Sequence, residues 1–372
     1  MGKAEWIAAG AGAGIVATIY ATPPVLYACL ADDENWGEFF KAAAAAYGAA
    51  TAGLLAVAAA SLALHNGRQD RKARQIVDDR RDNADTIREL RTRYTTAVEQ
   101  LADARTTISQ AGVYAIAAIA DDWLRITLPD TLQISVTAEA QSCINVLTAY
   151  LRQQHPNFDH DDIEYRHEGQ ADQVVRDTIL RTIVEHLRPG YHRQPWTELT
   201  FDLNGATLHN ANFEDCVFHG TANFGAARFY GTRTAFSNAR FHGFAIFAEA
   251  QFFGNNTEFS FTRFRTGANF EGVKFRSCNR TLFDSAVFGT ITTFVNTEFY
   301  SKETHFSDIE FGGPVTFKNA LFDGDLVSFE SPVEWGNVIF DWNDDVRWQP
   351  PNVVPKSWPP QVAKIDPTTD KE

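Results

Sequence analysis

Large apolar side chains return at short, regular intervals through the second half of the chain, and these intervals constrain the fold more than any other feature. From Leu203, large residues recur five positions apart at Leu208 and Phe213. A small residue stands two positions before each of the later ones, as Ala206 and Ala211 do. Beyond residue 213 the steps repeat as five, six, five and seven residues, which sum to 23. The pattern predicts a chain that coils, with one coil for each period.

The 23-residue period places one series of phenylalanines at equivalent positions, and we expect these to form a column of the core: Phe218, Phe241, Phe264, Phe288 and Phe311. Four large residues per period predict four faces. Each face would hold one large and one small inward side chain, because a narrow cross-section has no room for two large ones. Coils stacked about 4.8 Å apart pair their backbone amides and lay ring upon ring. The predicted fold of residues 195–345 is a right-handed quadrilateral β-helix, and a β-helix of larger bore stays open because these coils exceed four five-residue units.

This core is large enough to order a solenoid. Each buried phenylalanine stabilises by about 1.5–3 kcal/mol relative to exposure, and about two dozen such positions are present. The two open ends of a solenoid need caps. We expect the helical segment Asp172–Leu187 to cover the first coil and Asp341–Trp348 to cover the last, followed by a Pro-rich extended tail over residues 346–372.

The first 66 residues contain two long runs without charge, at residues 6–31 and 42–64. Each run is long enough to cross about 30 Å of hydrocarbon, so a transmembrane helical hairpin is predicted over residues 1–66. Basic residues such as Arg68 and Lys72 follow the second run, which predicts cytoplasmic termini at the plasma membrane. A signal peptide is the alternative interpretation of the first run.

The middle of the chain, residues 67–190, has the periodicity of helices. Gln69–Leu101 alternates charges of both signs with apolar residues at three- and four-residue intervals. Further helical segments are expected at Ala111–Leu124 and Val136–Gln153, before the one at Asp172–Leu187.

Three segments of this middle region, Arg93–Leu101, Gly112–Ile116 and Ala120–Asp122, together with the five-residue repeat, resemble actinobacterial pentapeptide-repeat membrane proteins. The resemblance implies a two-span anchor, a HEAT-like helical region and a pentapeptide-repeat β-helix, in that order. It therefore implies an all-α N-terminal part followed by a solenoid.

Few residues in the sequence suggest catalysis, metal binding or cofactor binding. The His/Asp-rich stretch at residues 155–168 contains metal-ligand types, but its Pro156-Asn157 sequence is more typical of a solvated loop. The four cysteines are far apart and form no CxxC pair. No nucleophile elbow, HExxH or phosphate-binding loop is present. We predict no catalytic residue, no metal site and no cofactor.

One outward column of the predicted β-helix carries separated charges. The residues before the large side chains of this column are basic in the first half and acidic in the second, and in chain order they are Val217, Arg240, Arg263, Val287, Glu310 and Glu334. Arg240 and Arg263 are the basic residues, and Glu310 and Glu334 are the acidic ones. These four residues are the candidate interaction surface.

We expect a membrane-anchored scaffold that contacts the lipid bilayer through its two spans and binds a protein partner through the rod. The net charge of −14 argues against nucleic acid as a partner. Homo-oligomerisation is left open. The alternative is a DNA-mimic that binds a topoisomerase such as gyrase, as some soluble pentapeptide-repeat proteins do, although a mimic would need acidic residues along its whole length.

Overall fold

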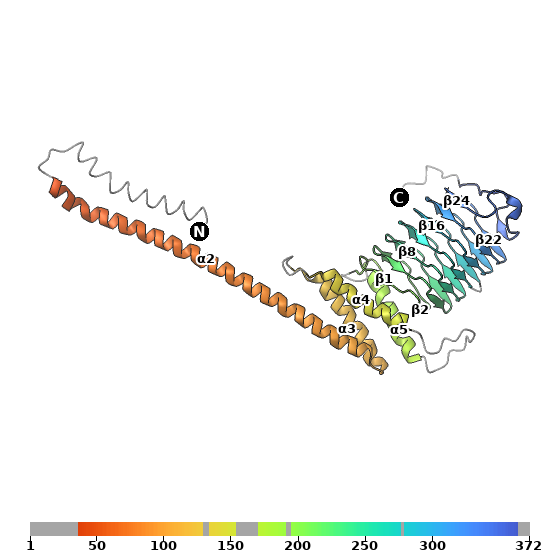
Figure 1. The fold of residues 1–372 in the computed structure, drawn as a ribbon, viewed down its shortest axis with the longest axis horizontal. Helices are drawn as coiled ribbons and strands as arrows, with labels where there is room; N and C mark the ends of the chain where they lie inside the picture. Colours follow the sequence, from red (N-terminus) through yellow and green to blue (C-terminus); the bar gives the residue numbers. More distant parts are fainter. Residues whose placement is uncertain (1–35, 129–133, 154–169, 191–194, 277–278, 364–372) are drawn as a thin grey trace. The chain divides into compact units, whose positions relative to one another are not determined.

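The computed structural model describes residues 36–128, 134–153, 170–190, 195–276 and 279–363 (Figure 1). Its contacts divide the chain into two compact units, residues 1–87 and 88–372. The first predicted span, residues 6–31, lies outside the described residues, and so does the signal-peptide alternative for it.

Helix α2 runs without interruption over Trp36–Leu101 and contains the whole second predicted span. Among the described residues, no helix is both long and apolar enough to cross a membrane. The predicted transmembrane hairpin is thus not confirmed. No proline occurs in α2, and the helix continues past residue 66, where we had expected the hairpin to end.

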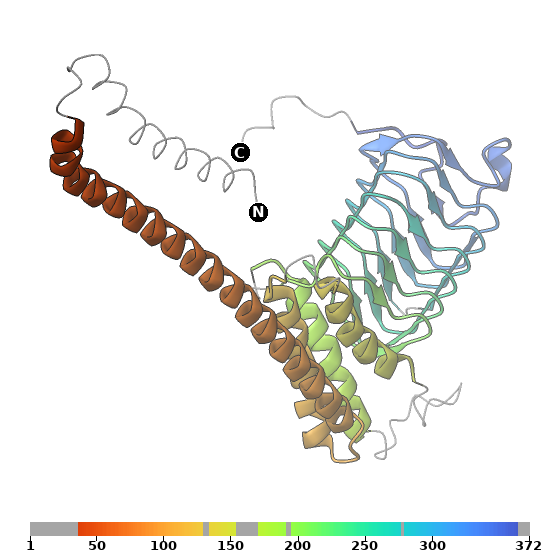
Figure 2. The same ribbon diagram turned by 60° about the vertical axis from the view of Figure 1, so that its left-hand side comes forward.

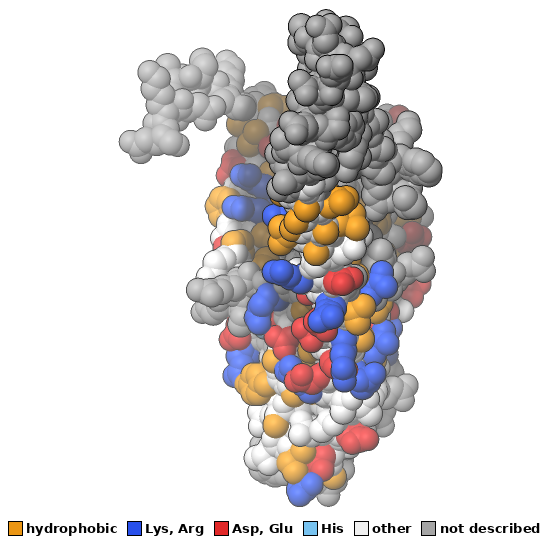
Figure 3. Space-filling model, turned by 90° about the vertical axis from the view of Figure 1, so that its left-hand side faces the viewer, with side chains coloured by type: hydrophobic (Ala, Val, Ile, Leu, Met, Phe, Trp, Pro, Cys, Tyr) orange, Lys and Arg blue, Asp and Glu red, His pale blue; other side chains and the backbone are white. Residues whose placement is uncertain are grey.

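The surface of α2 changes character along its length. Leu55, Val57, Leu62 and Leu64 are each more than 60% exposed. Figure 3 shows a group of hydrophobic side chains, with basic and acidic side chains interspersed beyond it. The alternating charges predicted for Gln69–Leu101 therefore lie on one helix with an exposed apolar stretch.

Three shorter helices follow, at α3 (Thr106–Arg125), α4 (Val136–Arg152) and α5 (Gln170–Leu187). Ile116, Ile144 and Ile183 are fully buried between them. Gly112 lets α3 approach the end of α2, because a Cβ at this position would lie 2.4 Å from the backbone nitrogen of Leu101. These helices confirm the predicted helical middle, whereas its likeness to HEAT repeats stays a prediction.

The rest of the second unit is a parallel β-solenoid with four sheets, which we name faces A to D in chain order (Figure 2). Face A contains β1 (Phe201–Asp202), β4 (Ala222–Asn223), β8 (Ala245–Ile246), β12 (Ala268–Asn269), β16 (Thr292–Thr293), β20 (Val315–Thr316) and β24 (Val338–Ile339). Face B contains β2 (Thr207–His209), β5 (Arg228–Tyr230), β9 (Gln251–Phe252), β13 (Lys274–Phe275), β17 (Glu298–Phe299) and β21 (Leu321–Phe322). Face C contains β6 (Arg233–Ala235), β10 (Asn256–Glu258), β14 (Arg280–Leu282), β18 (Glu303–His305), β22 (Leu326–Ser328) and β25 (Val353–Val354). Face D contains β3 (Val217–Phe218), β7 (Arg240–Phe241), β11 (Arg263–Phe264), β15 (Val287–Phe288), β19 (Glu310–Phe311) and β23 (Glu334–Trp335).

The interior of the solenoid consists of stacked phenylalanine rings, one column behind each face. Behind face D, the rings of Phe218 and Phe241 are 4.8 Å apart and within 3° of parallel, and Phe264 continues the stack 5.0 Å further. The column ends less regularly, since Phe311 and Trp335 meet edge to face at 69°. The predicted four columns and the 23-residue register are confirmed, and the right-handed sense stays a prediction.

Two corners of a coil are tight turns. Between faces A and B, Ala227 N donates to Phe224 O at 3.1 Å, and Ala226 has a φ of 50°. Between faces C and D, Ala239 N donates to Phe236 O, and Asn238 has a φ of 59°. A positive φ at the third position is the geometry of a type II turn. The longer coils are accommodated at the other two corners.

Helices close the first end of the solenoid. The side chain of Gln141 in α4 makes two hydrogen bonds of 2.8 Å with the backbone of Thr200, and Arg152 forms an ion pair with Asp202 of β1. After α5, Arg188 Nε donates to Glu214 O at 2.8 Å. The predicted cap helix is present, and α4 contributes as well.

The second end is closed by a longer segment than we predicted. Strand β25 pairs with β22, and Trp358 lies against the last rings, 4.9 Å from Phe340 and 5.5 Å from Trp342. Residues 346–363 therefore pack on the solenoid and are not an extended tail, because the last aromatic layer needs a cover. Residues 364–372 lie outside the described residues.

Candidate functional site

The four charged residues singled out in the sequence lie on one ladder of face D. Arg240 pairs in register with Arg263, and Glu310 pairs with Glu334. Val287 stands between the two pairs, in register with Arg263 on one side and Glu310 on the other. Arg240, Arg263 and Glu334 are exposed, and Glu310 is half-buried. The predicted column is thus a real surface feature, while its role in binding stays a prediction.

The ladder is held in place from behind. Strands β7 and β11 each have only two residues, an outward arginine and an inward phenylalanine. Successive coils are joined by backbone hydrogen bonds, such as Arg240 N to Cys216 O at 2.8 Å and Arg263 N to Ala239 O at 2.9 Å. Phe241 and Phe264 are fully buried and stacked 5.0 Å apart. The Cα positions of the charged residues are therefore fixed relative to one another.

The charges of face D have no partners in the described chain. No ion pair among the described residues involves Arg240, Arg263, Glu310 or Glu334. On each half of the face the in-register neighbours instead carry the same sign, about 4.8 Å apart along the ladder. Like charges directly opposite on neighbouring strands destabilise a sheet. This arrangement leaves the face able to accept opposite charge from outside.

Charges on faces B and C are arranged differently. Lys274 and Glu298 form a 3.1 Å ion pair on face B, and Arg280 pairs with Glu303 at 2.8 Å on face C. These pairs join residues in register on neighbouring coils. They are neutralised within the chain, so they offer less to a charged partner.

Arg233 is the centre of a small network on face C. It forms ion pairs with Glu214 and Glu258, whose side chains are 29% and 19% exposed. Hydrogen bonds to these two carboxylates raise the pKa of Arg233, and the hydrogen bond from Arg233 lowers the pKa of Glu214. Sequence reasoning missed this network, although the 23-residue step between Arg233 and Asn256 places Glu258 on the same face.

The border of face D toward face A is bulky in its first half and bare in its second. His242 and Arg265 follow the phenylalanines of β7 and β11, whereas Gly289, Gly312 and Gly336 occupy the same position on later coils and are exposed. Burial and the neighbouring His219 lower the pKa of His242, which favours the neutral imidazole. The positive charge of this half therefore comes from its arginines.

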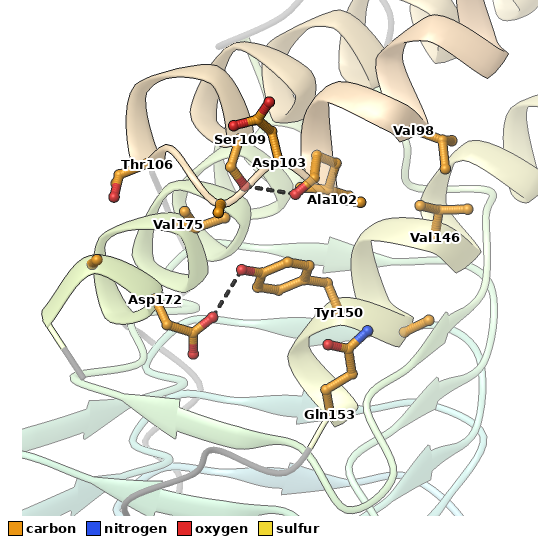
Figure 4. Close-up of a pocket in the computed structure, with 14 residues that line it drawn as sticks. Val98, Ala102, Asp103, Thr106, Ser109, Val146, Tyr150, Gln153, Asp172 and Val175 are labelled. Carbon is orange, nitrogen blue, oxygen red and sulfur yellow. Dashed lines mark hydrogen bonds between the residues drawn. The ribbon is translucent and has the colours of Figure 1, made fainter. Parts of the chain in front are cut away.

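A cavity of about 590 Å³ lies among the helices and is lined by side chains of α3, α4 and α5 and the end of α2 (Figure 4). Tyr150 donates to Asp172 Oδ1 at 2.8 Å, and Asp172 Oδ2 also accepts from Arg176 at 2.6 Å. Burial and the bond to Asp172 raise the pKa of Tyr150 to about 12. These polar groups satisfy one another and join α4 to α5, so the cavity does not combine a nucleophile with a free base.

Metal-ligand chemistry is not assembled in the described part of the chain. The described residues contain no group of three or more His, Cys, Asp or Glu side chains that could hold an ion. The His/Asp-rich stretch considered in the sequence lies within residues 154–169, outside the described residues. Cys143 and Cys216 are both buried, and burial raises the pKa of each thiol to about 12.

Comparison with known proteins agrees with the solenoid. A family model described as pentapeptide repeats, in nine copies, matches residues 203–251, the first part of the β-solenoid. No curated protein and no solved structure matches the chain. The match supports the repeat. It does not extend to the helical region or to Arg263, Glu310 and Glu334, which lie beyond residue 251.

Proposed function

We propose that this protein is a non-catalytic scaffold whose β-solenoid binds another protein through face D. The observation that carries the proposal is a set of charges without ion-pair partners among the described residues, three of them exposed and Glu310 half-buried, fixed in a rigid ladder with like signs stacked on each half. A partner with complementary charges would relieve the repulsion within each half. No such relief is needed on face C, whose arginines already contact carboxylates.

Rigidity favours such a role. Association costs free energy whenever side chains and loops must be ordered on binding. On face D the backbone is already fixed by stacked rings and inter-coil hydrogen bonds, so ordering costs are limited to the arginine and glutamate side chains. A flat, preorganised surface of this kind suits protein recognition better than binding of a small molecule, which requires a concave pocket.

We also propose that the alanine-rich N-terminal segment anchors the protein to the plasma membrane with both termini in the cytoplasm. Support comes from the two uncharged runs at residues 6–31 and 42–64 and from the basic residues that follow the second run. Carbonate extraction of cell membranes tests this proposal. The intact chain should stay in the membrane pellet, and a variant with arginine pairs in both runs, Ile15→Arg/Val16→Arg and Leu54→Arg/Leu55→Arg, should be released. Release of the intact chain would refute the anchor.

Charge distribution favours a protein partner over topoisomerase binding by DNA mimicry. A mimic of duplex DNA presents acidic groups along its length, whereas Arg240 and Arg263 are exposed on the first half of face D. We therefore expect the purified full chain to leave supercoiling by gyrase unaffected. Inhibition by the wild-type chain at stoichiometric concentrations would favour the mimic.

Crosslinking and affinity capture test the role of face D. The tagged full-length chain would be captured from cells after mild crosslinking, alongside Glu310→Arg/Glu334→Arg. A matched control, Glu271→Arg/Asp323→Arg, makes the same charge change at exposed positions away from face D. We expect partners to be lost in the first variant and kept in the control. Identical partners in all three samples would exclude face D as the contact.

A further inference from the structure

The ladder on face D is symmetric in position and opposite in sign about one residue. Val217 begins the ladder on the first coil, and the five positions after it read, in register, Arg240, Arg263, Val287, Glu310 and Glu334. The symmetry holds over these five positions. One coil before Val287 stands an arginine and one coil after it a glutamate. The same holds two coils away on each side. A surface with this arrangement is complementary to itself when one copy is reversed.

We propose that the partner of face D is a second copy of this chain, held in a two-fold symmetric dimer with Val287 at its centre. This inference rests on the proposed function, because it names the occupant of the same surface. The two-fold axis lies between the two faces and runs along the strands at the level of Val287. It reverses the direction of the second solenoid, so that Arg263 faces Glu310 of the other copy and Arg240 faces Glu334.

The charges select this orientation over the other way of stacking two such faces. If the two-fold axis ran along the solenoids instead, each residue would face its own equivalent. Arg240 would then oppose Arg240, and Glu310 would oppose Glu310, which repels. An isologous interface brings residue i against residue j and j against i. The ladder meets that condition with four Arg–Glu contacts, to which each copy contributes two arginines and two glutamates.

The column of residues that follow the inward aromatic residues on face D supports the same arrangement by its shape. Rotation about the proposed axis places Arg265 opposite Gly312 of the second copy and His242 opposite Gly336. All three glycines of this column, Gly289 included, are exposed. Bulky side chains of the first half thus meet bare backbone of the second half, and Arg265 gains room to reach Glu310 of the other copy.

The size of the face determines how tightly we expect the two copies to bind each other. Four coil steps of about 4.8 Å make the charged ladder about 19 Å long. A contact of this size is small beside the roughly 1,600 Å² of a standard stable interface. We therefore expect a weak dimer that depends on its ion pairs, with an affinity that falls as salt screens exposed charges.

Charge reversal tests the proposal directly. Sedimentation velocity of the purified full chain, in a buffer with a non-ionic detergent, would compare three variants with the wild type. Arg240→Glu/Arg263→Glu makes the whole ladder acidic, and Glu310→Arg/Glu334→Arg makes it basic. Each should weaken self-association by about tenfold or more. Combining all four substitutions in one chain restores complementarity and should restore the dimer, and mixing the two half-reversed chains should give a heterodimer.

Two results would overturn the dimer. One is a wild-type chain that stays monomeric at its highest soluble concentration in low salt. The other is a four-fold variant that stays monomeric although its circular dichroism and unfolding temperature match the wild type. If the chain is monomeric and yet loses other captured proteins when Glu310 and Glu334 are reversed, this inference fails and the proposed function stands.

Site-directed crosslinking places the axis. With Cys29 and Cys278 changed to serine, Val287→Cys should be joined to its counterpart in a second chain by a short bismaleimide, because the two positions meet at the axis. Packed sheets lie about 10 Å apart, which suits such a reagent better than a disulfide. Thr293→Cys on face A of the same coil is the matched control and should give no crosslinked dimer. Equal crosslinking at both positions would contradict the proposed axis.

Discussion

Faces C and D of the solenoid cover the same kind of core and differ in how their charged side chains are arranged. Behind each, phenylalanine rings stack at about the same spacing, 4.9 Å between Phe236 and Phe259 and 5.0 Å between Phe241 and Phe264. On face C the outward arginines contact carboxylates of the same chain. On face D, arginine stands next to arginine. The interior therefore does not determine the surface, and a regular solenoid can carry one self-satisfied face beside one that is open to a partner.

If the two faces share one core, disrupting the phenylalanine column behind either face should lower the free energy of unfolding by the same amount. Phe264→Asp behind face D and Phe259→Asp behind face C would each bury an unpaired carboxylate in a fully buried stack. We expect each to destabilise the solenoid by about 4 kcal/mol or more, enough to unfold it. Chemical unfolding followed by circular dichroism measures the loss. Phe253→Asp, on the half-buried outer surface, should retain the fold, and tolerance of either core variant would contradict the shared core.

A close approach of backbone at the border between faces D and A gives the next largest effect. A Cβ at Gly243 would lie 2.2 Å from Gly220 O on the preceding coil. We expect Gly243→Ala to lower the free energy of unfolding by about 1–3 kcal/mol, because the two coils must separate locally. Gly289→Ala is the matched change, since its nearest contact would be 3.3 Å, and it should cost clearly less. Equal losses in thermal unfolding would refute this account.

The comparison of surfaces predicts opposite results for two arginine substitutions. Arg233→Met on face C removes ion pairs to Glu214 and Glu258 and should destabilise the chain by about 1 kcal/mol. Arg263→Met on face D removes a charge that only repels Arg240, and we expect no loss of stability in the dilute protein. Urea unfolding of both variants measures the difference. A larger loss for Arg263→Met would reverse our assignment of the two faces.

Acidic pH should reduce the difference in stability between the wild type and Arg233→Met. The hydrogen bond from Arg233 lowers the pKa of Glu214 from its ordinary value of 4.5. A lowered folded pKa contributes stability above the unfolded value, and the contribution is lost as pH falls through the folded value. The gap in unfolding temperature between wild type and Arg233→Met should thus narrow below about pH 4.5. A gap that widens in acid would show that the contact acts in another way.

Sequence alone was sufficient for the repeating part of the molecule, because every coil repeats one physical requirement. A large and a small inward residue on each face reappear at 23- or 24-residue steps, so Phe218, Phe241 and Phe264 identified a column and Arg240 and Glu310 identified the ladder outside it. The register follows from counting. Nothing in that count depends on contacts between distant, unlike segments.

The parts that escaped prediction depend on such contacts. Trp358 stands among prolines, which suggested a tail, yet its ring contacts come from three different segments, at Phe329, Trp335 and Phe340. The network around Arg233 also joins three coils. In both cases the side chain's neighbours are set by how the coils end or turn corners, and these features have no fixed period in the sequence.

Closure of both ends has a consequence for how such a rod can change length. Helix α4 forms hydrogen bonds with the backbone of the first coil, and Trp358 packs on the last ring layer. Inserting or deleting one 23-residue unit in the middle would leave both terminal fits intact while moving Arg240 closer to or farther from Glu334. The distance between the basic and acidic ends of face D can therefore change only in steps of one whole coil.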